Sequence, residues 1–311
     1  MNEAEHVCTE LPPAIDRLVA LGFRLDAIYP ADDPHTAILT GKDGVVRLTS
    51  RPGAPRPSTE LPPFAPEFLL DSGGEAGEGR AGMLYRDLIP GRLGGRYIAS
   101  LIAIPEGGPV PDWVHFHRIT LQLICVRAGW VRVVYEDQGA PFVMCAGDVV
   151  LQPPGIRHRV LESSPGLEVV EITCPALHET FAEHELILLN DKLDAARLFD
   201  GQRFVRHVAE QTQWTSFGGG EAQETEIGNA TGGLAEARIV RATGGKALEF
   251  PPHNGELVFG FVFEGAATLD FRGSHPVVAS DAFVIPPGEP WRLCDGSADF
   301  SLLHVTTARI A

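Results

Sequence analysis

The 311-residue sequence has few basic residues and no long apolar run. Lysine and arginine total 25 against 41 acidic residues, which gives a formal charge of −16 with neutral histidines. The basic residues are scattered, and a nucleic-acid surface needs a basic patch. An acidic membrane surface is disfavoured for the same reason. No stretch reaches the roughly 20 apolar residues of a membrane-spanning helix. The sequence therefore predicts neither a nucleic-acid partner nor a membrane.

Cysteine is also scarce. The five cysteines are odd in number and lack Cys-x-x-Cys spacing, so reduced thiols in a cytoplasmic protein are the simplest interpretation. The N-terminus, Met-Asn-Glu-Ala-Glu, lacks the basic start and apolar run of a signal peptide, which agrees with a cytoplasmic location. By contrast, hydrophobic residues make up 44% of the chain, and it has 34 glycines and 25 prolines. This composition favours sizeable cores and many short strands joined by turns.

Residues 1–82 are expected to form a small α+β extension followed by a linker. An amphipathic helix is predicted over 14–21, and strands over 23–29, 36–40 and 45–49, with a hairpin turn at Gly41-Lys42-Asp43-Gly44. The run from Leu18 to Phe23 with these strands is similar to part of a vicinal-oxygen-chelate (glyoxalase-like) module; the alternative is a cap that packs on the main body. Residues 51–82, rich in proline, glycine and glutamate, predict a linker with little structure of its own.

The rest of the chain predicts two β-rich domains, over 83–175 and 221–311, with a helical connector over 176–220. Strands are expected over 97–104, 121–126, 131–135, 149–151, 159–161 and 167–173. Short strands at close spacing are typical of an all-β barrel or sandwich. The second block repeats the first: Val126-Arg127-Ala128-Gly129 matches Val262-Phe263-Glu264-Gly265, and Gln152-Pro-Pro-Gly155 matches Ile285-Pro-Pro-Gly288. A repeat of this length indicates a duplicated domain.

The candidate functional residues form a spaced pattern in the first block. His115-Phe116-His117 is followed by Gln122 and Gly129, and then by Gly147-x5-Pro-x-Gly-x2-His158. Residues i and i+2 of a strand face the same side about 7 Å apart, so two imidazoles there can converge on one ion. A third imidazole from a neighbouring strand completes a facial set of ligands. The pattern indicates a site for one divalent metal ion.

This two-part pattern resembles the signature of the cupin superfamily, and its repetition resembles a bicupin, which has two cupin barrels in one chain. The resemblance implies two double-stranded β-helix barrels and gives His115, His117 and His158 as imidazole ligands, with Gln122 as an optional oxygen ligand. Three positions depart from the family pattern: Gly108 comes one residue early, Glu162 replaces an asparagine, and Gln122 replaces the usual glutamate.

The glutamine has an electrostatic consequence. Neutral imidazoles and a neutral amide leave a divalent ion with its full charge, whereas a glutamate would halve that charge and could also serve as a base. One charge at 4 Å is worth about 4 kcal/mol at an effective dielectric of 20. We therefore expect the site to prefer an anionic ligand bound to the metal, such as a carboxylate, enolate, phenolate or catecholate. The alternatives are a metal without catalysis, or three buried histidines hydrogen-bonded without metal.

The second block offers a comparison within the chain. Alignment on Gly129 and Gly265 places Pro251, His253 and Val258 opposite His115, His117 and Gln122, and alignment of the Pro-Pro-Gly segments places Trp291 opposite His158. Only one of the four ligand positions is kept, so the second barrel is predicted to be metal-free, with Trp291 filling the pocket and His253 bonded to Glu256. The second barrel is expected to have a structural role, as a cover for the first barrel or as an oligomer interface.

The first functional hypothesis is a metal-dependent dioxygenase, similar to three-histidine cupin dioxygenases, acting on a small anionic substrate chelated to Fe(II). Manganese, nickel, copper or zinc also suit imidazole ligation. A second hypothesis is a non-redox isomerase or lyase in which the metal polarises a carbonyl. A third is a small-molecule-binding cupin without turnover. Arg132, Arg157 and Arg159 are candidates for binding a substrate carboxylate. No catalytic residue is assigned, and a homo-oligomer is compatible with the sequence.

Overall fold

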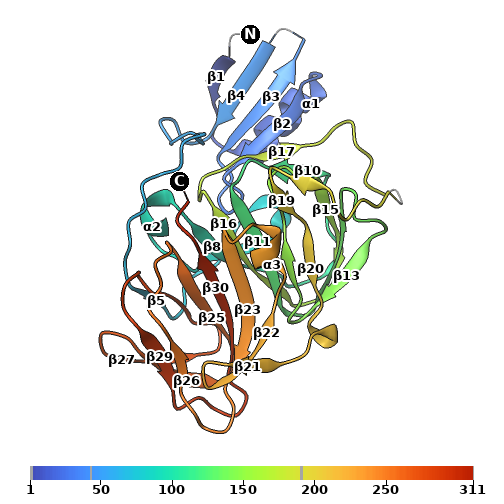
Figure 1. Ribbon diagram of the computed structural model, residues 1–311. Coiled ribbons are helices and arrows are strands. Elements are labelled where there is room, and N and C mark those ends of the chain that lie inside the picture. The colour runs from blue at the N-terminus through green and yellow to red at the C-terminus, as the bar shows by residue number, and fades with distance from the viewer. Residues whose placement is uncertain (1–2, 43, 190–191, 311) are drawn as a thin grey trace.

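A computed structural model describes residues 3–42, 44–189 and 192–310. The chain forms two β-barrels that lie side by side, with a small α+β unit at one end of the first barrel (Figure 1). Each barrel consists of two sheets, which confirms the predicted all-β pair of double-stranded β-helix barrels. Among the described residues, no helix is long and apolar enough to span a bilayer.

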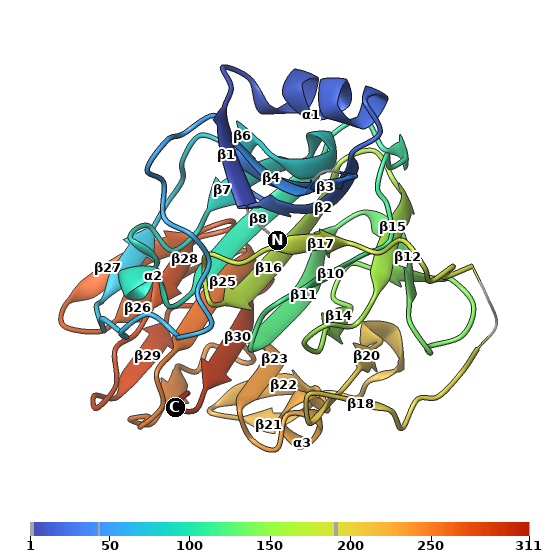
Figure 2. The ribbon, with the colours of Figure 1, turned by 90° about the horizontal axis from the view of Figure 1, so that it is seen from above.

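The N-terminal unit contains one helix and four strands. They are β1 (Glu3–Val7), α1 (Leu11–Ala20), β2 (Arg24–Tyr29), β3 (Thr36–Gly41) and β4 (Gly44–Thr49). The predicted helix and three strands are present, and the helix begins three residues early because Pro12 and Pro13 occupy its first turn, where a missing N–H costs nothing. The predicted hairpin turn includes Asp43, which lies outside the described residues. Helix α1 lies across one face of this small sheet (Figure 2).

The first barrel occupies the middle of the chain. One sheet runs β1-β4-β3-β2-β17-β10-β15-β12-β13, with β9 (Gly108–Pro109), β10 (His115–His117), β12 (Trp130–Tyr135), β13 (Phe142–Cys145), β15 (His158–Ser163) and β17 (Thr180–Ala182). The other runs β20-β14-β11-β16-β8-β7-β6, with β6 (Gly77–Glu78), β7 (Leu84–Asp87), β8 (Ile98–Ile104), β11 (Leu121–Ala128), β14 (Val149–Leu151), β16 (Leu167–Cys174) and β20 (Val205–His207). The N-terminal unit therefore extends the sheet that carries the histidines.

The second barrel has the same plan. Its larger sheet runs β21-β22-β23-β30-β25-β28-β5, with β5 (Leu69–Asp71), β21 (Thr215–Phe217), β22 (Gly220–Glu224), β23 (Ala235–Arg241), β25 (Val258–Glu264), β28 (Ala282–Val284) and β30 (Ser301–Thr307). The smaller sheet runs β24-β29-β26-β27, with β24 (Leu248–Phe250), β26 (Ala266–Asp270), β27 (Ser274–Val278) and β29 (Trp291–Cys294). Short helices complete the chain: η1 (Arg80–Gly82), α2 (Arg92–Gly95), η2 (Ala209–Gln211) and α3 (Ile227–Ala230).

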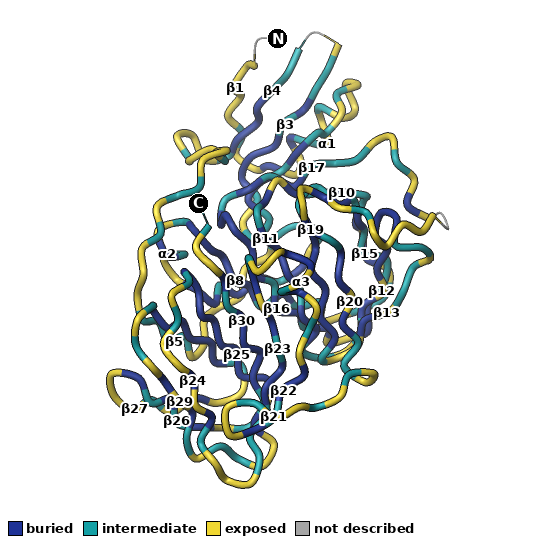
Figure 3. Tube along the Cα trace, in the orientation of Figure 1, coloured by how far each residue is buried: buried dark blue, intermediate teal, exposed yellow. Residues whose placement is uncertain are grey.

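Alternation along the strands separates the barrel interior from the interface between the barrels. In β16, Leu167, Val169 and Glu171 line a cavity inside the first barrel, whereas Val170 and Ile172 join a core shared with the second barrel. Successive residues of a strand point to opposite faces, so one strand serves both cores. The buried parts of the trace follow these packed strands, while the loops and β1 are exposed (Figure 3).

Two predicted connections are wrong in detail. The linker is not structureless, because β5 pairs with β28 of the second barrel and β6 pairs with β7 of the first. The connector predicted to be helical over 176–220 is not helical in its described residues, apart from the short η2. It contains β17, paired with both β10 and β2, and β18 (Leu198–Phe199), paired with β19 (Gln202–Arg203). Pairing with neighbouring strands satisfies the backbone here and overrides the weak helical pattern of the sequence.

The predicted duplication is confirmed by matching backbone interactions. Gly155 N–H donates to the His117 carbonyl at 3.1 Å, and Gly288 N–H donates to the His253 carbonyl at 3.1 Å. Gly129 and Gly265 have φ angles of +74° and +75°. A Cβ on either glycine would lie within 2.4 Å of a serine hydroxyl, that of Ser164 or Ser297. The two hairpins therefore need glycine for the same two reasons, backbone conformation and space.

Candidate metal centre

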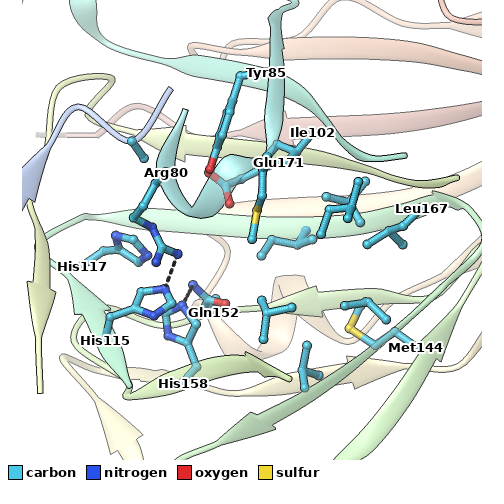
Figure 4. Close-up of a pocket in the computed structure, with 18 of the residues that line it drawn as sticks. Arg80, Tyr85, Ile102, His115, His117, Met144, Gln152, His158, Leu167 and Glu171 are labelled. Carbon is cyan, nitrogen blue, oxygen red and sulfur yellow. Dashed lines mark hydrogen bonds between the residues drawn. The ribbon is translucent and has the colours of Figure 1, made fainter. Parts of the chain in front are cut away.

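Two adjacent strands bring the three predicted histidines together. His115 and His117 share one face of β10, and His115 lies opposite His158 of β15 in the strand register. All three residues are buried, and their candidate ligand atoms lie within 4.8 Å of one another. The sequence prediction of a three-imidazole cluster is confirmed, and the rings converge on one end of a cavity (Figure 4).

Backbone carbonyls orient two of the rings. His115 Nδ1 donates to the Trp113 carbonyl at 2.8 Å, and His158 Nδ1 donates to the Ile156 carbonyl at 3.1 Å. Each bond leaves the Nε2 lone pair free to accept, which is the usual arrangement of a metal-binding histidine. Burial lowers the pKa of His158 to about 4 and holds the pKa values of His115 and His117 well below 6.5. The rings are therefore neutral at pH 7, the form that binds a metal ion.

An arginine that the sequence did not single out reaches the same point. Arg80 of η1 donates to Asp112 Oδ1 at 2.6 Å and to His115 Nε2 at 3.0 Å. Asp112 is fully buried and also accepts the backbone N–H groups of Trp113 and Val160, each at 2.9 Å. Arg80 is held firmly, yet its buried Nε has no hydrogen-bond partner. An unpaired buried donor costs about 1–3 kcal/mol unless a ligand accepts from it.

The backbone before the barrel positions this arginine. Arg80 N–H donates to the Ala31 carbonyl of the N-terminal unit at 2.9 Å. Gly79 passes so close to that carbonyl that an added Cβ would lie 2.6 Å from it. Ala31 and Arg80 both line the cavity, so residues outside the barrel complete its wall. No local sequence pattern indicates this contact, because it depends on how the N-terminal unit docks.

Gln122 reaches the histidines through a second glutamine. Gln152 Nε2 donates to Gln122 Oε1 at 2.6 Å and to His158 Nε2 at 3.1 Å. Tyr135 O–H donates to Gln152 Oε1 at 2.8 Å and fixes the amide orientation. Gln152 lines the cavity, whereas Gln122 is not among the lining residues. Direct ligation by Gln122 stays a prediction.

The cavity next to the histidines has a volume of about 80 Å³ and is mostly apolar. Its polar groups lie toward one side, where Glu171 and Tyr85 stand near Arg80 (Figure 4). The apolar wall is formed by Met83, Ile102, Ile104, Ile124, Val131, Val133, Met144, Val160, Leu167 and Val169. A molecule bound here would meet polar groups at one end and hydrocarbon at the other.

Glu171 is a polar cavity residue whose pKa differs from the usual value of a glutamate. Burial raises its pKa to about 7, against the opposing effects of the Gln122 amide and the Arg80 guanidinium. Burial likewise raises the pKa of Tyr85 above its usual value. Glu171 was not predicted from the sequence, although one signal was present: it is an acidic residue on the inward-facing side of a strand whose other inward residues include Leu167 and Val169.

The arginines named from the sequence do not line the cavity. Arg157 donates to Glu183 Oε2 at 2.8 Å and lies over the Phe116 ring at 4.1 Å. Arg132 and Arg159 are likewise not among the lining residues. The arginine expected beside the site is instead Arg80.

The equivalent end of the second barrel contains aromatic rings. Trp291 lies opposite Phe250 in the register, as His158 lies opposite His115, and the two aromatic rings stack 3.8 Å apart. This corrects the sequence alignment, in which Pro251 stood opposite His115: the second barrel has one extra residue before His253. His253 Nε2 donates to the Ile285 carbonyl at 3.2 Å and not to Glu256.

Comparison with known proteins identifies solved structures that have a similar fold. No family model matches the chain, and no curated protein matches it. Among solved structures, the Escherichia coli protein YlbA superposes with a TM-score of 0.59 at 12% identity, over 80% of this chain and 95% of that one. The oxalate decarboxylase of Lactobacillus farciminis, in a formate complex, gives 0.54 at 14% identity, over 82% and 88%. The Bacillus subtilis oxalate decarboxylase gives 0.56 at 12% identity, over 85% and 80%.

The chain has a bicupin fold. At these identities the likeness concerns architecture alone, and it agrees with the duplication seen in the backbone interactions. The chemistry of this chain depends on its own site residues, because function resides in the site and not in the fold.

Proposed function

We propose that this bicupin is an enzyme whose first barrel holds one divalent transition metal ion on His115, His117 and His158. The observation that carries the proposal is the convergence of three buried, neutral imidazoles within 4.8 Å, two of them oriented by backbone carbonyls. When bound, the ion supplies Lewis acidity or redox chemistry at the end of the cavity. Gln122 is proposed as a further oxygen ligand, which requires its amide to leave Gln152.

The charge of the site favours an anionic substrate. The three imidazoles and the glutamine amides are uncharged, and the Arg80 guanidinium, which pairs with Asp112 through one of its nitrogens, adds a positive group beside them. Arg80 Nε is a buried donor without a partner, placed to receive an oxyanion. A carboxylate, enolate or phenolate oxygen bound at the metal would therefore also be held by arginine.

The shape of the cavity indicates that the substrate has an apolar part. Most of the wall is made of aliphatic side chains and Met83 and Met144, which offer no hydrogen bonds to a second polar end. Oxalate, named in the titles of the decarboxylase structures, is two carboxylates without a hydrocarbon portion, and burying its second carboxylate here would be costly. We therefore propose a monoanionic substrate with a small hydrocarbon portion, in contrast to oxalate.

The first reaction class we propose is dioxygenation with Fe(II). Two features support it: an all-imidazole set of protein ligands leaves coordination positions for substrate and dioxygen, and the apolar cavity suits an apolar gas molecule. Manganese, nickel and copper remain proposed alternatives, as imidazole suits all of them.

The second class is a non-redox isomerase or lyase, with zinc or manganese as the ion. Glu171 favours it, because a carboxyl group with a pKa of about 7 is suited to move a proton on the substrate near neutral pH. Oxygen uptake during turnover of small apolar carboxylates and enols separates the two classes. Product formed under nitrogen at the aerobic rate would exclude the dioxygenase.

The metal site itself is tested by elemental analysis of the purified protein. The wild type should carry about one transition metal ion per chain, and His115→Ala should lose it. Gln122→Glu should keep the ion but bind anions more weakly, because the added negative charge offsets the charge of the ion. A tightly bound, unreacted small molecule in the purified protein would instead favour a binding protein without turnover.

A further inference from the structure

The cavity contains a carboxylate that metal binding does not use. Glu171 lies in β16, which belongs to the sheet facing the histidine-bearing strands, and it lines the cavity that those histidines also line. Figure 4 shows its carboxylate beside the Tyr85 hydroxyl, on the side of the cavity away from His158. These two groups are polar lining residues in addition to Arg80, Gln152 and the histidines, in a cavity whose remaining wall is mostly apolar.

The neighbours of Glu171 leave part of its bonding capacity open. The Gln122 amide lies against it from β11, the strand next to β16, and the Thr173 side chain lies close to it on β16 itself. An ionised carboxylate can accept about four hydrogen bonds, and the remaining neighbours along the cavity are hydrocarbon, apart from Tyr85 and the more distant Arg80. A buried polar group is costly unless it is hydrogen-bonded, so a ligand that donates to Glu171 would gain more than one that does not.

The second barrel carries a different residue at the same position. Glu171 lies opposite Ile124 in the first barrel, and His304 lies opposite Gly260 in the second. Because Gln122 corresponds to Val258, these two positions are equivalent. His304 is surrounded by the rings of Phe217, Phe250 and Trp291, whereas Glu171 faces open space. An acid is therefore not required by the packing of the barrel.

We propose that Glu171, with the Tyr85 hydroxyl beside it, determines specificity by accepting a hydrogen bond from a hydroxyl or amine of the substrate, at a point away from the anionic group held at the metal. The proposal rests on the proposed function and specifies its substrate class: a small molecule with an anionic oxygen at one end, a hydrocarbon portion, and an N–H or O–H donor directed toward β16. Apolar acids without this donor should bind less tightly.

The test uses two pairs of probes that differ by one hydroxyl group: butanoate with 4-hydroxybutanoate, and pentanoate with 5-hydroxypentanoate. The hydroxyl is distant from the carboxylate, so it does not chelate the metal together with it. Dissociation constants are measured by calorimetry on the full-length protein, with its metal content determined. At a pH of about 8.5 the Glu171 carboxyl group is ionised. A hydrogen bond to an ionised group raises affinity about tenfold or more, so at least one hydroxy acid should bind the wild type about tenfold or more tightly than its parent acid.

Three variants make the result specific to Glu171. Glu171→Leu should abolish the preference while the parent acids bind at least as tightly as before. Glu171→Gln keeps an acceptor oxygen and should keep part of the preference. Glu168→Leu, a change on the same strand at a residue that instead pairs with Arg127 outside the cavity, should behave as wild type.

Each alternative outcome has a separate meaning. If the parent acids bind but neither hydroxy acid is preferred, or if the preference survives in Glu171→Leu, the role of Glu171 is wrong while the proposed function stands. If neither the parent acids nor the hydroxy acids bind the metal-loaded wild type, the anion site of the proposed function fails, and this inference fails with it.

Discussion

At the scale of single residues, the centre depends on competition for imidazole lone pairs. The Nε2 atoms of His115 and His158 accept hydrogen bonds from Arg80 and Gln152, and these are the atoms that a metal ion would use. Gln152 is neutral and can turn aside, but Arg80 also brings a positive charge that repels a cation. The guanidinium therefore opposes the metal while it favours the anion that would bind beside it.

This competition predicts opposite effects of one substitution. Arg80→Gln removes the positive charge and leaves the buried Asp112 carboxylate without its ion-pair partner. Both changes favour a cation, so the affinity for a divalent metal should rise at least about tenfold, while the affinity for butanoate on the metal-loaded protein should fall at least about tenfold. Metal affinity is measured by competition with a chelator, and anion affinity by calorimetry. Arg118→Gln is the control, because Arg118 is exposed and pairs with Glu179. Parallel changes in both affinities would contradict this account of Arg80.

A second residue-scale prediction concerns pH and lies in the other barrel. Burial lowers the pKa of His304 from 6.5 to about 3, so between these values the unfolded chain binds a proton that the folded chain does not. The stability due to neutral His304 is present above pH 6.5 and is lost as the pH falls. Between pH 7.5 and pH 5 this residue should lower the free energy of unfolding by about 2 kcal/mol.

The measurement compares denaturant unfolding of wild type and His304→Leu at the two pH values. The variant should lose about 2 kcal/mol less stability on acidification than the wild type, since leucine does not titrate. His6→Leu serves as the control, because it removes an exposed histidine instead of a buried one. An identical pH dependence in wild type and His304→Leu would show that protonation of His304 is not coupled to unfolding.

The three histidines could be predicted from the sequence, whereas Arg80 and Glu171 could not, because only the histidines are brought together by local strand geometry. His115, His117 and His158 lie at fixed spacings within strands and a tight turn, so their convergence follows from strand geometry. Arg80 enters from a segment whose position depends on the docking of the N-terminal unit, for which the sequence contains no local sign. Glu171 was visible only as a polar residue on an inward-facing strand side, which requires knowing which side faces inward.

At the scale of elements, the hairpin turns carry the most local information. Gly129 ends β11 with φ +74°, and a Cβ there would lie 2.4 Å from the hydroxyl oxygen of Ser164 and 3.2 Å from Leu167 Cα. Gly166 also has a positive φ, +67°, but a Cβ there would meet nothing within 4 Å. Gly166 therefore reports on backbone conformation alone, whereas Gly129 reports on backbone conformation together with crowding.

This pair gives an element-scale prediction. Gly166→Ala should cost about 1 kcal/mol of stability, the usual penalty of the left-handed conformation for alanine. Gly129→Ala should cost about 1–3 kcal/mol more, because Ser164 and the adjoining backbone must also shift. Both are measured by denaturant unfolding monitored by tryptophan fluorescence. Equal costs at the two positions would mean that the turn around Gly129 yields without strain.

The strands of the two barrels were predictable because they repeat and alternate, whereas the connections were not. The segment 51–82 contains prolines and glycines typical of a linker, yet β5 completes a sheet of the second barrel. Near residue 180 the sequence pattern suggested a helix, yet β17 joins the first barrel to the N-terminal unit. In both cases the segment becomes a strand because it pairs with a sheet edge from a distant part of the chain. The local sequence does not show that this edge is available.

At the scale of the whole molecule, the two barrels share one core. Residues of both contribute to a continuous cluster, with Leu123 and Val170 from the first barrel and Phe259 and Val305 from the second. A shared core of this kind couples the unfolding of its two halves. The second barrel therefore supports the sheet behind Glu171 even though its own histidine cluster is replaced by aromatic rings.

A buried ion pair crosses this interface. Arg96 donates to both carboxylate oxygens of Glu256, at 3.0 and 2.8 Å, and each side chain is 7% exposed. Tyr97 O–H and Ile310 N–H donate to the same carboxylate, at 3.0 and 3.2 Å. Every oxygen of Glu256 thus has partners from other parts of the chain, and removing one charge would leave the other buried and unpaired.

The resulting prediction distinguishes a structural charge pair from a surface one. Arg96→Met should lower the free energy of unfolding by about 3–5 kcal/mol, because Glu256 is then an uncompensated buried charge. The double variant Arg96→Met, Glu256→Gln should recover part of that loss, since the buried charge is gone. Arg272→Met breaks the exposed pair with Glu289 and should cost far less than Arg96→Met, because solvent screens the exposed pair. If Arg96→Met unfolded in two separate transitions, the barrels would be independent folding units and the shared core would not couple them.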